Sequence, residues 1–364
     1  MPVFGHVVKK YQFKCIWNEN LSYQLNVLCC KKIFRDTEVS LVTGSDNGTV
    51  QVHKAIKVNN VISGFEKNGR SYETKGGSIQ TLLPQNVTKF SSEDVLVGDA
   101  NGLFTIITNG QILNRRSLCG SRIAAVVVDV DSAGNTSIVV GSSDGTMVAV
   151  TPYDILWKCR LSEVLKQEER FSANSSISSM HVFRMQSASA DTSYVIVADA
   201  EKRIHFFQNE RLVTTLLVPS VVTSMCSGYF LNEDCPNDSP SKSTASPLKG
   251  QRGYDEQVAL ATRSGAVFIL SNFNVVPYTN LSYPITQIKS LPASGSDDVD
   301  ALLCCGHFNK LCILQNRMCV STFTTEDWIH SFDFVDAAVC GDSLLLVLGC
   351  VDNSVRILEI EKTR

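Results

Sequence analysis

The sequence lacks the features that mark several large functional classes. No apolar run reaches the ~18–20 residues that a transmembrane helix needs, and the start of the chain has no long apolar core of the kind found in a signal peptide. An excess of charge of one sign is also missing, because 33 Lys and Arg stand against 36 Asp and Glu, a net charge of −3. Since nucleic-acid binding needs clustered basic residues, this balance argues against DNA or RNA as a partner. We expect a cytoplasmic protein with no direct membrane insertion.

Motifs for catalysis and cofactor binding are scarce as well. We find no Walker lysine motif and no Gly-x-Gly-x-x-Gly loop to hold a nucleotide, and we expect no Gly-x-Ser-x-Gly elbow to carry a nucleophile. The 13 cysteines are scattered without the CxxC pairs of a zinc site, which indicates buried free thiols in a reducing compartment. His53, His181 and His205 lie in apolar strand contexts, which favours neutral, hydrogen-bonded imidazoles over catalytic bases. We therefore expect no enzyme activity and no cofactor.

An internal repeat decides the fold. Seven segments share one pattern: a short apolar run, a small or polar turn, and a second apolar run, which together indicate a β-hairpin. Asn-Gly, Asp-Gly and Ser-Gly turns occur in four of them, and the other three turn at Glu201-Lys202, Phe308-Asn309 and Asn353-Ser354. The seven segments are Ser40–His53, Asp94–Ile107, Ser137–Val150, Tyr194–Phe207, Val258–Leu270, Ala301–Leu314 and Leu344–Leu358.

Counting strands around these hairpins predicts a closed ring. One further strand precedes each hairpin, and another follows the first six, Val61–Thr74 being the first of these. The last hairpin has no following strand, while Val7–Trp17 remains unassigned at the start of the chain. Pairing these two completes seven four-stranded blades and leaves no open sheet edge. Although ~150 residues per domain would suggest two or three domains, we predict one all-β domain over residues 1–364, a single seven-bladed β-propeller closed by its N-terminal strand.

The repeats resemble degenerate WD40 and FG-GAP-like propellers. The stretch from Asp129 through Asp131 and Gly134 to Gly141 looks like an FG-GAP unit, and Tyr194–Cys226 has the rhythm of a BBSome propeller blade. The BBSome propellers, and the integrin-alpha FG-GAP repeat-containing and kaptin-like subunits of the KICSTOR complex, are built in this way. The FG-GAP resemblance raises calcium at Asp129 and Asp131. Two carboxylates are few for a Ca²⁺ cage, so the other interpretation is a turn in which Asp caps local N–H groups, with no metal bound.

Surface loops remain as candidate binding sites. Hairpin turns and inter-blade connections share one face of a propeller, which we name the top face. This face is expected to present mostly polar side chains for protein binding: Asp46, Asn47, Asp99, Asn101, Arg122, Asp144, Arg263, His307, Trp328 and Asp352.

The opposite, bottom face is expected to be acidic. Its seven loops, residues 31–38, 85–94, 130–136, 185–193, 231–257, 292–300 and 336–343, hold 16 Asp and Glu but 7 Lys and Arg. They either dock a basic partner or keep the ring soluble. The longest loop contains residues 232–257, which we predict to be disordered, with proline-directed phosphorylation candidates at Ser239 and Ser246. Residues Ser162–Phe171 are predicted to form a short helix that covers a blade edge.

These observations predict a non-catalytic scaffold or adaptor subunit of a multiprotein complex, whose partners are other protein subunits. The resemblance implies either BBSome-like ciliary trafficking or KICSTOR-like nutrient signalling at the lysosome. The alternative is a substrate-receptor propeller of a ubiquitin ligase that captures a peptide in its top funnel. A top pocket of Arg and aromatic residues favours the alternative, whereas an exposed apolar patch on the rim favours a fixed subunit.

Overall fold

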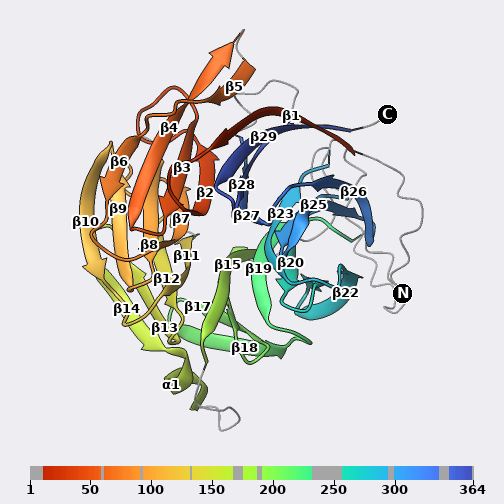
Figure 1. The fold of residues 1–364 in the computed structure, drawn as a ribbon. Coiled ribbons are helices and arrows are strands. Elements are labelled where there is room, and N and C mark those ends of the chain that lie inside the picture. The colour runs from red at the N-terminus through yellow and green to blue at the C-terminus, as the bar shows by residue number, and fades with distance from the viewer. Residues whose placement is uncertain are drawn as a thin grey trace.

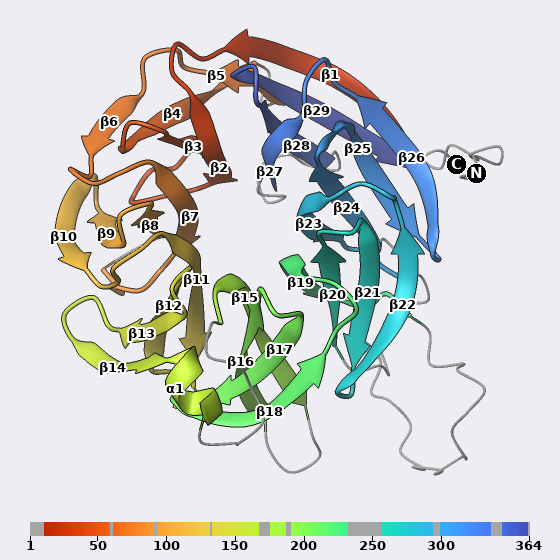
Figure 2. The same cartoon turned by 60° about the horizontal axis from the view of Figure 1, so that its bottom comes forward.

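Seven antiparallel sheets form a ring, as the sequence predicts (Figures 1 and 2). The computed structural model describes residues 11–58, 61–90, 93–131, 133–166, 175–186, 191–231, 256–293, 299–335 and 344–362. Six sheets have four strands, and the first has five. The chain is therefore a seven-bladed all-β propeller.

In blades 1 to 6 the strands run from the inner side of the ring outward in chain order. Blade 1 contains β2 (Leu25–Lys31), β3 (Ser40–Ser45), β4 (Thr49–Val58), β5 (Val61–Phe65) and β6 (Arg70–Glu73). Blades 2 and 3 contain β7 (Ile79–Gln85), β8 (Asp94–Asp99), β9 (Leu103–Thr108), β10 (Gln111–Ser117), β11 (Ile123–Val130), β12 (Thr136–Ser142), β13 (Thr146–Val150) and β14 (Ile155–Arg160). Blades 4 and 5 contain β15 (Ile177–Gln186), β16 (Asp191–Asp199), β17 (Arg203–Gln208), β18 (Arg211–Leu217), β19 (Val222–Gly228), β20 (Gln257–Thr262), β21 (Ala266–Ser271) and β22 (Asn274–Asn280). Blade 6 contains β23 (Ile285–Leu291), β24 (Ala301–Gly306), β25 (Phe308–Gln315) and β26 (Met318–Thr324), and blade 7 contains β27 (Ile329–Phe334), β28 (Leu344–Cys350), β29 (Ser354–Lys362) and, outermost, β1 (Tyr11–Asn20).

Blade 7 closes the ring with strands from both ends of the chain. β1 pairs antiparallel with β29 from Tyr11 opposite Lys362 to Asn20 opposite Ser354, and Figure 2 shows the two strands side by side. The predicted closure is confirmed, although the strand runs beyond the expected Trp17, and residues 7–10 lie outside the described part. Trp17 packs edge-on against Phe65 of β5, with ring centroids 5.8 Å apart, which ties blade 7 to blade 1.

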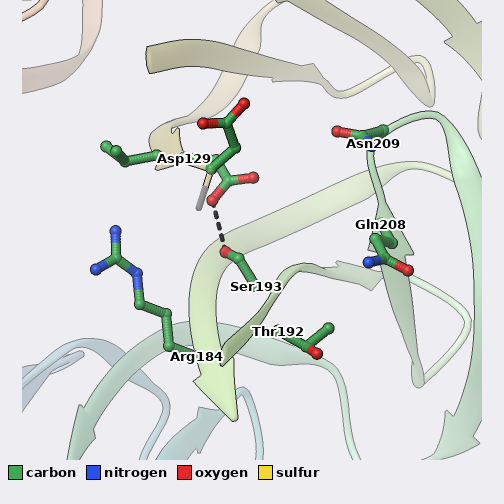
Figure 3. A pocket seen from close by; sticks show the side chains of 8 residues that line it. Asp129, Arg184, Thr192, Ser193, Gln208 and Asn209 are labelled. Carbon is green, nitrogen blue, oxygen red and sulfur yellow. Dashed lines mark hydrogen bonds between the residues drawn. The ribbon is translucent and has the colours of Figure 1, made fainter. Parts of the chain in front are cut away.

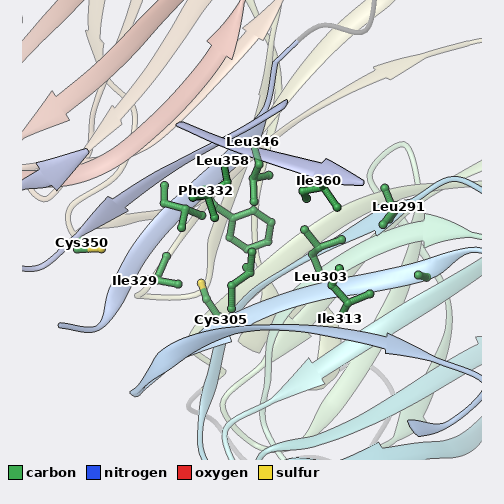
Figure 4. Close-up of a cluster of buried hydrophobic side chains, with 13 residues drawn as sticks. Leu291, Leu303, Cys305, Ile313, Ile329, Phe332, Leu346, Cys350, Leu358 and Ile360 are labelled. Carbon is green, nitrogen blue, oxygen red and sulfur yellow. The ribbon is translucent and has the colours of Figure 1, made fainter. Parts of the chain in front are cut away.

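Apolar packing between blades forms the core. Seven clusters of buried side chains lie one at each junction of neighbouring blades. The cluster between blades 6 and 7 surrounds the fully buried Phe332 (Figure 4). Because the middle strands are covered on both faces, they appear in the sequence as continuous apolar runs rather than alternating ones.

Close approach of the blades requires small residues near the ends of the second strands. A Cβ atom on Gly98 of β8 would lie 2.6 Å from Cγ2 of Ile123 in the next blade, nearer than real contacts allow. Four blades have a glycine at this strand position, Gly44, Gly98, Gly141 and Gly349, and each of them serves close packing against the next blade.

Backbone hydrogen bonds repeat around the top face. In each blade the residue that leaves the outer strand donates its N–H to the hairpin turn beneath it, as Leu118 does to the Gly102 carbonyl at 3.1 Å. The other six pairs are Thr74 to Gly48, Leu161 to Gly145, Val218 to Lys202, Leu281 to Gly265, Thr325 to Asn309 and Leu21 to Asn353. Turns and inter-blade connections thus share one face, as expected.

Several predicted details are wrong. Val61–Thr74 forms two strands, β5 and β6, which both pair with β4, so the described chain has 29 strands where 28 were expected. In blade 7 the left-handed turn residue is Asn353, with φ +65°, and not Ser354. The blade 6 hairpin turns at His307, because Gly306 already pairs with Phe308.

One short helix, α1 (Leu161–Lys166), follows blade 3. It falls within one residue of the start of the predicted Ser162–Phe171 helix, whose residues 167–171 lie outside the described part. Leu161 and Leu165 are buried in the cluster between blades 3 and 4. The helix therefore seals that junction.

Candidate protein-docking surfaces

The predicted top-face residues divide into exposed and buried positions. Asp99 is buried at 1% exposure and does not belong to the surface. Its Oδ1 accepts the N–H groups of Asn101 and Leu103 at 2.8 Å each, and its Oδ2 accepts that of Gly77 at 2.7 Å. The other members are exposed: Asp46, Asn47, Asn101, Arg122, Asp144, Arg263, His307, Trp328 and Asp352.

Three of the exposed members also stabilise their own turns. The side chains of Asn47, Asp144 and Asp352 accept the N–H groups of Thr49, Thr146 and Ser354 at 3.1, 2.9 and 2.9 Å. These bonds are typical of Asx turns. These three acidic and amide residues of the top face are therefore explained by turn geometry without a partner.

An aromatic patch lies on the top face of blades 6 and 7 and at the connection from blade 5. The imidazole of His307 stacks on the indole of Trp328, with centroids 5.1 Å apart and planes 17° apart. Tyr283 packs against Phe308 at 6.2 Å. Val351 donates its N–H to the Trp328 carbonyl at 2.9 Å. The name aromatic patch below means Tyr283, His307, Phe308, Trp328 and Val351.

Three members of the aromatic patch expose much of their surface. Tyr283 is 58% exposed, Trp328 47% and Val351 42%. The structure thus brings together two predicted residues, His307 and Trp328, and adds members that sequence reasoning missed. The sequence did contain a signal for Tyr283. It follows the outer strand of blade 5 just as Trp328 follows the outer strand of blade 6, so both belong to connections between blades.

The chemistry around the aromatic patch includes one cation and one neutral imidazole. Arg263 lies in the turn whose Gly265 packs on the backbone of Tyr283. Burial, together with His307 nearby, lowers the pKa of His330 on the adjoining inner strand. His330 is therefore neutral at pH 7, and Arg263 is an exposed cation in the turn that packs on the Tyr283 backbone.

The FG-GAP-like loop borders a cavity of about 360 Å³ between blades 3 and 4 (Figure 3). Ser193 donates its hydroxyl to Oδ1 of Asp129 at 2.5 Å. The carboxylate of Asp131 accepts the N–H groups of Ala133 and Asn135, at 2.9 and 2.8 Å, and the Asn135 side-chain amide. Hydrogen bonds from Asn135, Ala133 and Gly134 lower the pKa of Asp131.

This arrangement does not fit a calcium cage. The oxygens of Asp131 already receive N–H donors, and Ca²⁺ needs six to eight oxygen ligands. Among the described residues, no group of three or more His, Cys, Asp or Glu is placed to hold a metal. Asp131 acts instead as the cap of its own loop.

Blade 4 contains a buried ionic cluster that sequence reasoning missed. Oδ2 of Asp199 accepts the Arg203 guanidinium at 2.8 Å and lies 3.0 Å from Nε2 of His205, and all three side chains are buried. Oδ1 of Asp199 accepts the N–H groups of Glu201 and Arg203 at 2.9 Å each. Burial alone would raise the pKa of Asp199, but these partners hold it below its usual value. The turn of this blade has no glycine, and Lys202 takes the left-handed conformation there with φ +63°.

The other histidines of the expectation are also hydrogen-bonded. His53 lies 3.0 Å from the Tyr23 hydroxyl and 2.8 Å from the Glu66 carbonyl, and His181 lies 2.7 Å from the Ser227 hydroxyl. Burial lowers the pKa of His53, and that of His181 to about 4, so both are neutral at pH 7.

Potential nucleophiles are occupied or buried. One stretch, Gly141–Gly145, does have Gly-x-Ser-x-Gly spacing, but it forms a β-hairpin turn in place of the strand-to-helix elbow of a hydrolase. Its Ser143 hydroxyl hydrogen-bonds Ser121 at 3.0 Å. Cys304 and Cys305 are fully buried, and burial raises the pKa of Cys305 to about 12. The 11 described cysteines are free thiols.

A second cavity of about 510 Å³ is lined by inner strands of blades 1, 2, 6 and 7. Its charged groups are paired, because Lys289 binds Asp333, which also accepts the N–H of Cys30. Burial raises the pKa of Cys29 on the same wall. This lining offers no activated thiol.

Much of the predicted acidic bottom face lies outside the described residues, as do Ser239 and Ser246. The predicted disordered segment ends too late, because Gln257 begins β20 and is 3% exposed. Its Oε1 accepts the N–H groups of Phe230 and Leu231 at 2.9 Å each. The described residues contain no helix long and apolar enough to cross a membrane.

Comparison with known proteins places the fold. No protein-family model matches the chain, and no curated protein matches its sequence. Two crystal structures of BBS1N in complex with ARL6DN, one soaked with mercury and one with lead, are similar with TM-scores of 0.67 and 0.66 at 12% identity. They cover 96% and 97% of this chain, and 97% and 98% of theirs. The WD40 propeller domain of Doa1 has a TM-score of 0.63 at 15% identity, covering 95% of this chain and 96% of its own. The chain is therefore a seven-bladed β-propeller with the fold of the BBS1N and WD40 propellers.

Proposed function

We propose that this chain is a non-catalytic scaffold subunit of a cytoplasmic multiprotein complex, and that its propeller faces dock other proteins. The aromatic patch carries this proposal, because Tyr283 and Trp328 expose about half of their surface on a rigid support. Clustered exposed aromatic side chains are typical of protein interfaces, where they contribute much of the binding energy. Arg263 beside them adds a residue type that is enriched at such sites.

Similarity to solved propellers supports proteins as the partners. The BBS1N crystals contain ARL6DN, a second protein bound to a propeller of similar shape. With the sequence resemblance, this favours a subunit of either a BBSome-like trafficking complex or a KICSTOR-like nutrient-signalling complex. Association with the cilium or the lysosome would then come through partners.

The alternative function is the substrate receptor of a ubiquitin ligase. The exposed Arg263 favours it, since its turn packs on the backbone of Tyr283 and a cation near aromatic rings can hold an acidic or aromatic peptide. Exposed apolar side chains on the rim of blades 2 and 3, including Leu156 at 53% exposure, favour the fixed subunit. Co-purification of ligase subunits would distinguish the two functions.

Affinity purification tests the proposal. The tagged chain, its Tyr283→Ala/Trp328→Ala variant and a Leu217→Ala control are expressed in cells and purified gently, and bound proteins are quantified by mass spectrometry. Leu217 is a suitable control because it is 74% exposed on blade 4, outside the aromatic patch. We expect stoichiometric partners with the wild type and the control, and their loss from the double variant. Elution of the wild type alone as a monomer would overturn the proposal, and partners that persist in the double variant would remove the patch as its basis.

A further inference from the structure

Outer strands carry a repeated irregularity that exposes apolar side chains on one part of the rim. Every blade has a β-bulge where its third strand meets the strand outside it. In blades 2, 3 and 4 the extra residue is Leu113, Leu156 or Val213, with 36%, 53% and 44% of its surface exposed. In blade 5 it is Tyr278, which is 4% exposed. A bulge changes the direction of the side chain of its extra residue. This side chain therefore points outward in some blades and inward in others.

Four exposed apolar side chains lie on the adjoining rims of blades 2 and 3. The side-chain amide of Asn114 donates to the Pro152 carbonyl at 2.5 Å, and the Arg116 guanidinium donates to the Tyr153 carbonyl. These bonds hold β10 against the turn that precedes β14. Leu113, Tyr153, Ile155 and Leu156, which are 36%, 55%, 56% and 53% exposed, are named the rim patch.

Cationic side chains flank the rim patch and outnumber the acidic ones beside it. β10 and β14 contain no Asp or Glu and carry Arg115, Arg116, Lys158 and Arg160, while one exposed carboxylate, Asp154, stands between Tyr153 and Ile155. Arg115 donates to the Glu73 carbonyl at 2.7 Å and Lys158 to the Leu118 carbonyl at 2.8 Å, so their positions are fixed by the backbone. Within the part of the chain that the structure describes, none of the four lies at ion-pair distance from a carboxylate, although the charge of Arg160 helps to lower the pKa of Asp144.

A partner that covers this surface has to supply both apolar groups and negative charge. Covering the cations without counter-charge would be costly, because a buried charge needs a partner. Apolar contact over Ile155 and Leu156 removes their surface from water. Cations held at fixed positions favour a partner with carboxylates at matching positions over a fluid anionic surface.

We propose that the rim patch docks an acidic amphipathic segment of a partner protein. The apolar side chains of the segment pack on Leu113, Ile155 and Leu156, and its carboxylates pair with Arg115 and Lys158. Figure 2 shows β10 and β14 across the ring from β22 and β26, which places this surface away from the aromatic patch. The inference goes beyond the proposed function, since it assigns a second surface and the chemistry of its partner.

Fluorescence anisotropy with defined peptides tests the inference on the whole chain. The probe is a labelled peptide of about 16 residues, long enough to form a helix on binding, that repeats Glu-Leu-Leu-Glu. Two matched peptides replace either Glu by Lys or Leu by Ser. We expect binding of the Glu-Leu peptide only, weakening with salt. The proposal would be overturned if either matched peptide bound as tightly as the Glu-Leu peptide, or if the Glu-Leu peptide did not bind.

Variants locate the binding. Leu156→Asn and Lys158→Glu are expected to weaken the Glu-Leu peptide about tenfold, which corresponds to about 1.4 kcal/mol. Leu217→Asn, on the exposed rim of blade 4, is expected to leave binding unchanged. Lys158→Glu is also expected to strengthen binding of the Lys-Leu peptide, a gain that misfolding does not produce. The proposal would be overturned if Leu156→Asn and Lys158→Glu both left the affinity for the Glu-Leu peptide unchanged. It would also be overturned if the chain bound anionic vesicles of phosphatidylserine more strongly than the peptide and this binding required Leu156.

Discussion

The buried ionic cluster of blade 4 gives a prediction that can be worked out from the structure. Asp199→Ala removes a carboxylate that neutralises Arg203, whose side chain is 5% exposed and also donates to the Ser175 hydroxyl at 3.0 Å. Breaking such a pair costs about 3–5 kcal/mol of unfolding free energy. The matched control is Asp99→Ala in blade 2, because Asp99 caps its turn through the same two N–H bonds but has no buried arginine. That change removes only hydrogen bonds and is expected to cost about 1–3 kcal/mol.

A double-mutant cycle isolates the charge pair from the turn. Arg203→Met in the Asp199→Ala background removes the buried cation that Asp199 neutralised, so the double variant is expected to be more stable than Asp199→Ala by about 1–3 kcal/mol. Urea unfolding followed by tryptophan fluorescence measures all four proteins. The coupling is present above the usual pKa of an aspartate, 3.8, and is lost as the pH falls through the lower folded-state pKa of Asp199. A double variant no more stable than Asp199→Ala would refute this reasoning, as would a cost for Asp99→Ala equal to that of Asp199→Ala.

Three further predictions concern the core, the pH dependence and the closure. Phe332→Ala opens a cavity between blades 6 and 7 and is expected to cost about 3–5 kcal/mol, measured by urea unfolding. His181 has its folded pKa lowered to about 4 from 6.5, so the unfolded chain binds the proton first and stability falls as the pH drops from 6.5 to 4. His181→Asn is expected to flatten this part of the profile, and an unchanged slope would contradict the assignment. Deleting residues 1–20 removes β1 and exposes the edge of β29, so light scattering is expected to show aggregates of this variant. Deletion of residues 1–10 is the control and is expected to cause no aggregation. A variant without residues 1–20 that stayed monomeric would contradict this role for β1.

The hairpins were predictable because their information is local. A strand covered on both faces appears as an apolar run, and a left-handed turn requires a residue such as Gly48, which has φ +82°. The closing strand was predictable only by counting, since β1 and β29 are joined by no local signal. The split of Val61–Thr74 into two strands had a local signal that was overlooked, namely the Asn68-Gly69 pair between them.

The surfaces were less predictable because they depend on contacts between blades. The burial of Asp99 depends on Gly77, which precedes it by 22 residues in the sequence. His307 and Trp328 belong to different turns, and only the ring places their side chains in a stack. Sequence identities of 12–15% to similar propellers show that the fold tolerates nearly complete change of its residues. Particular surface residues therefore cannot be carried over from those structures.

The pairing of β1 with β29 also sets how the ring responds to force. The antiparallel register places Tyr11 opposite Lys362, so the strand ends nearest to both chain termini lie at the same end of the ladder. Tension applied through the termini would load these hydrogen bonds one after another, as in the opening of a zipper, and not all together in shear. A complex that pulled on both ends of this chain would peel blade 7 apart under a modest load. Tethering through one end would leave the pairing of β1 with β29 unstressed.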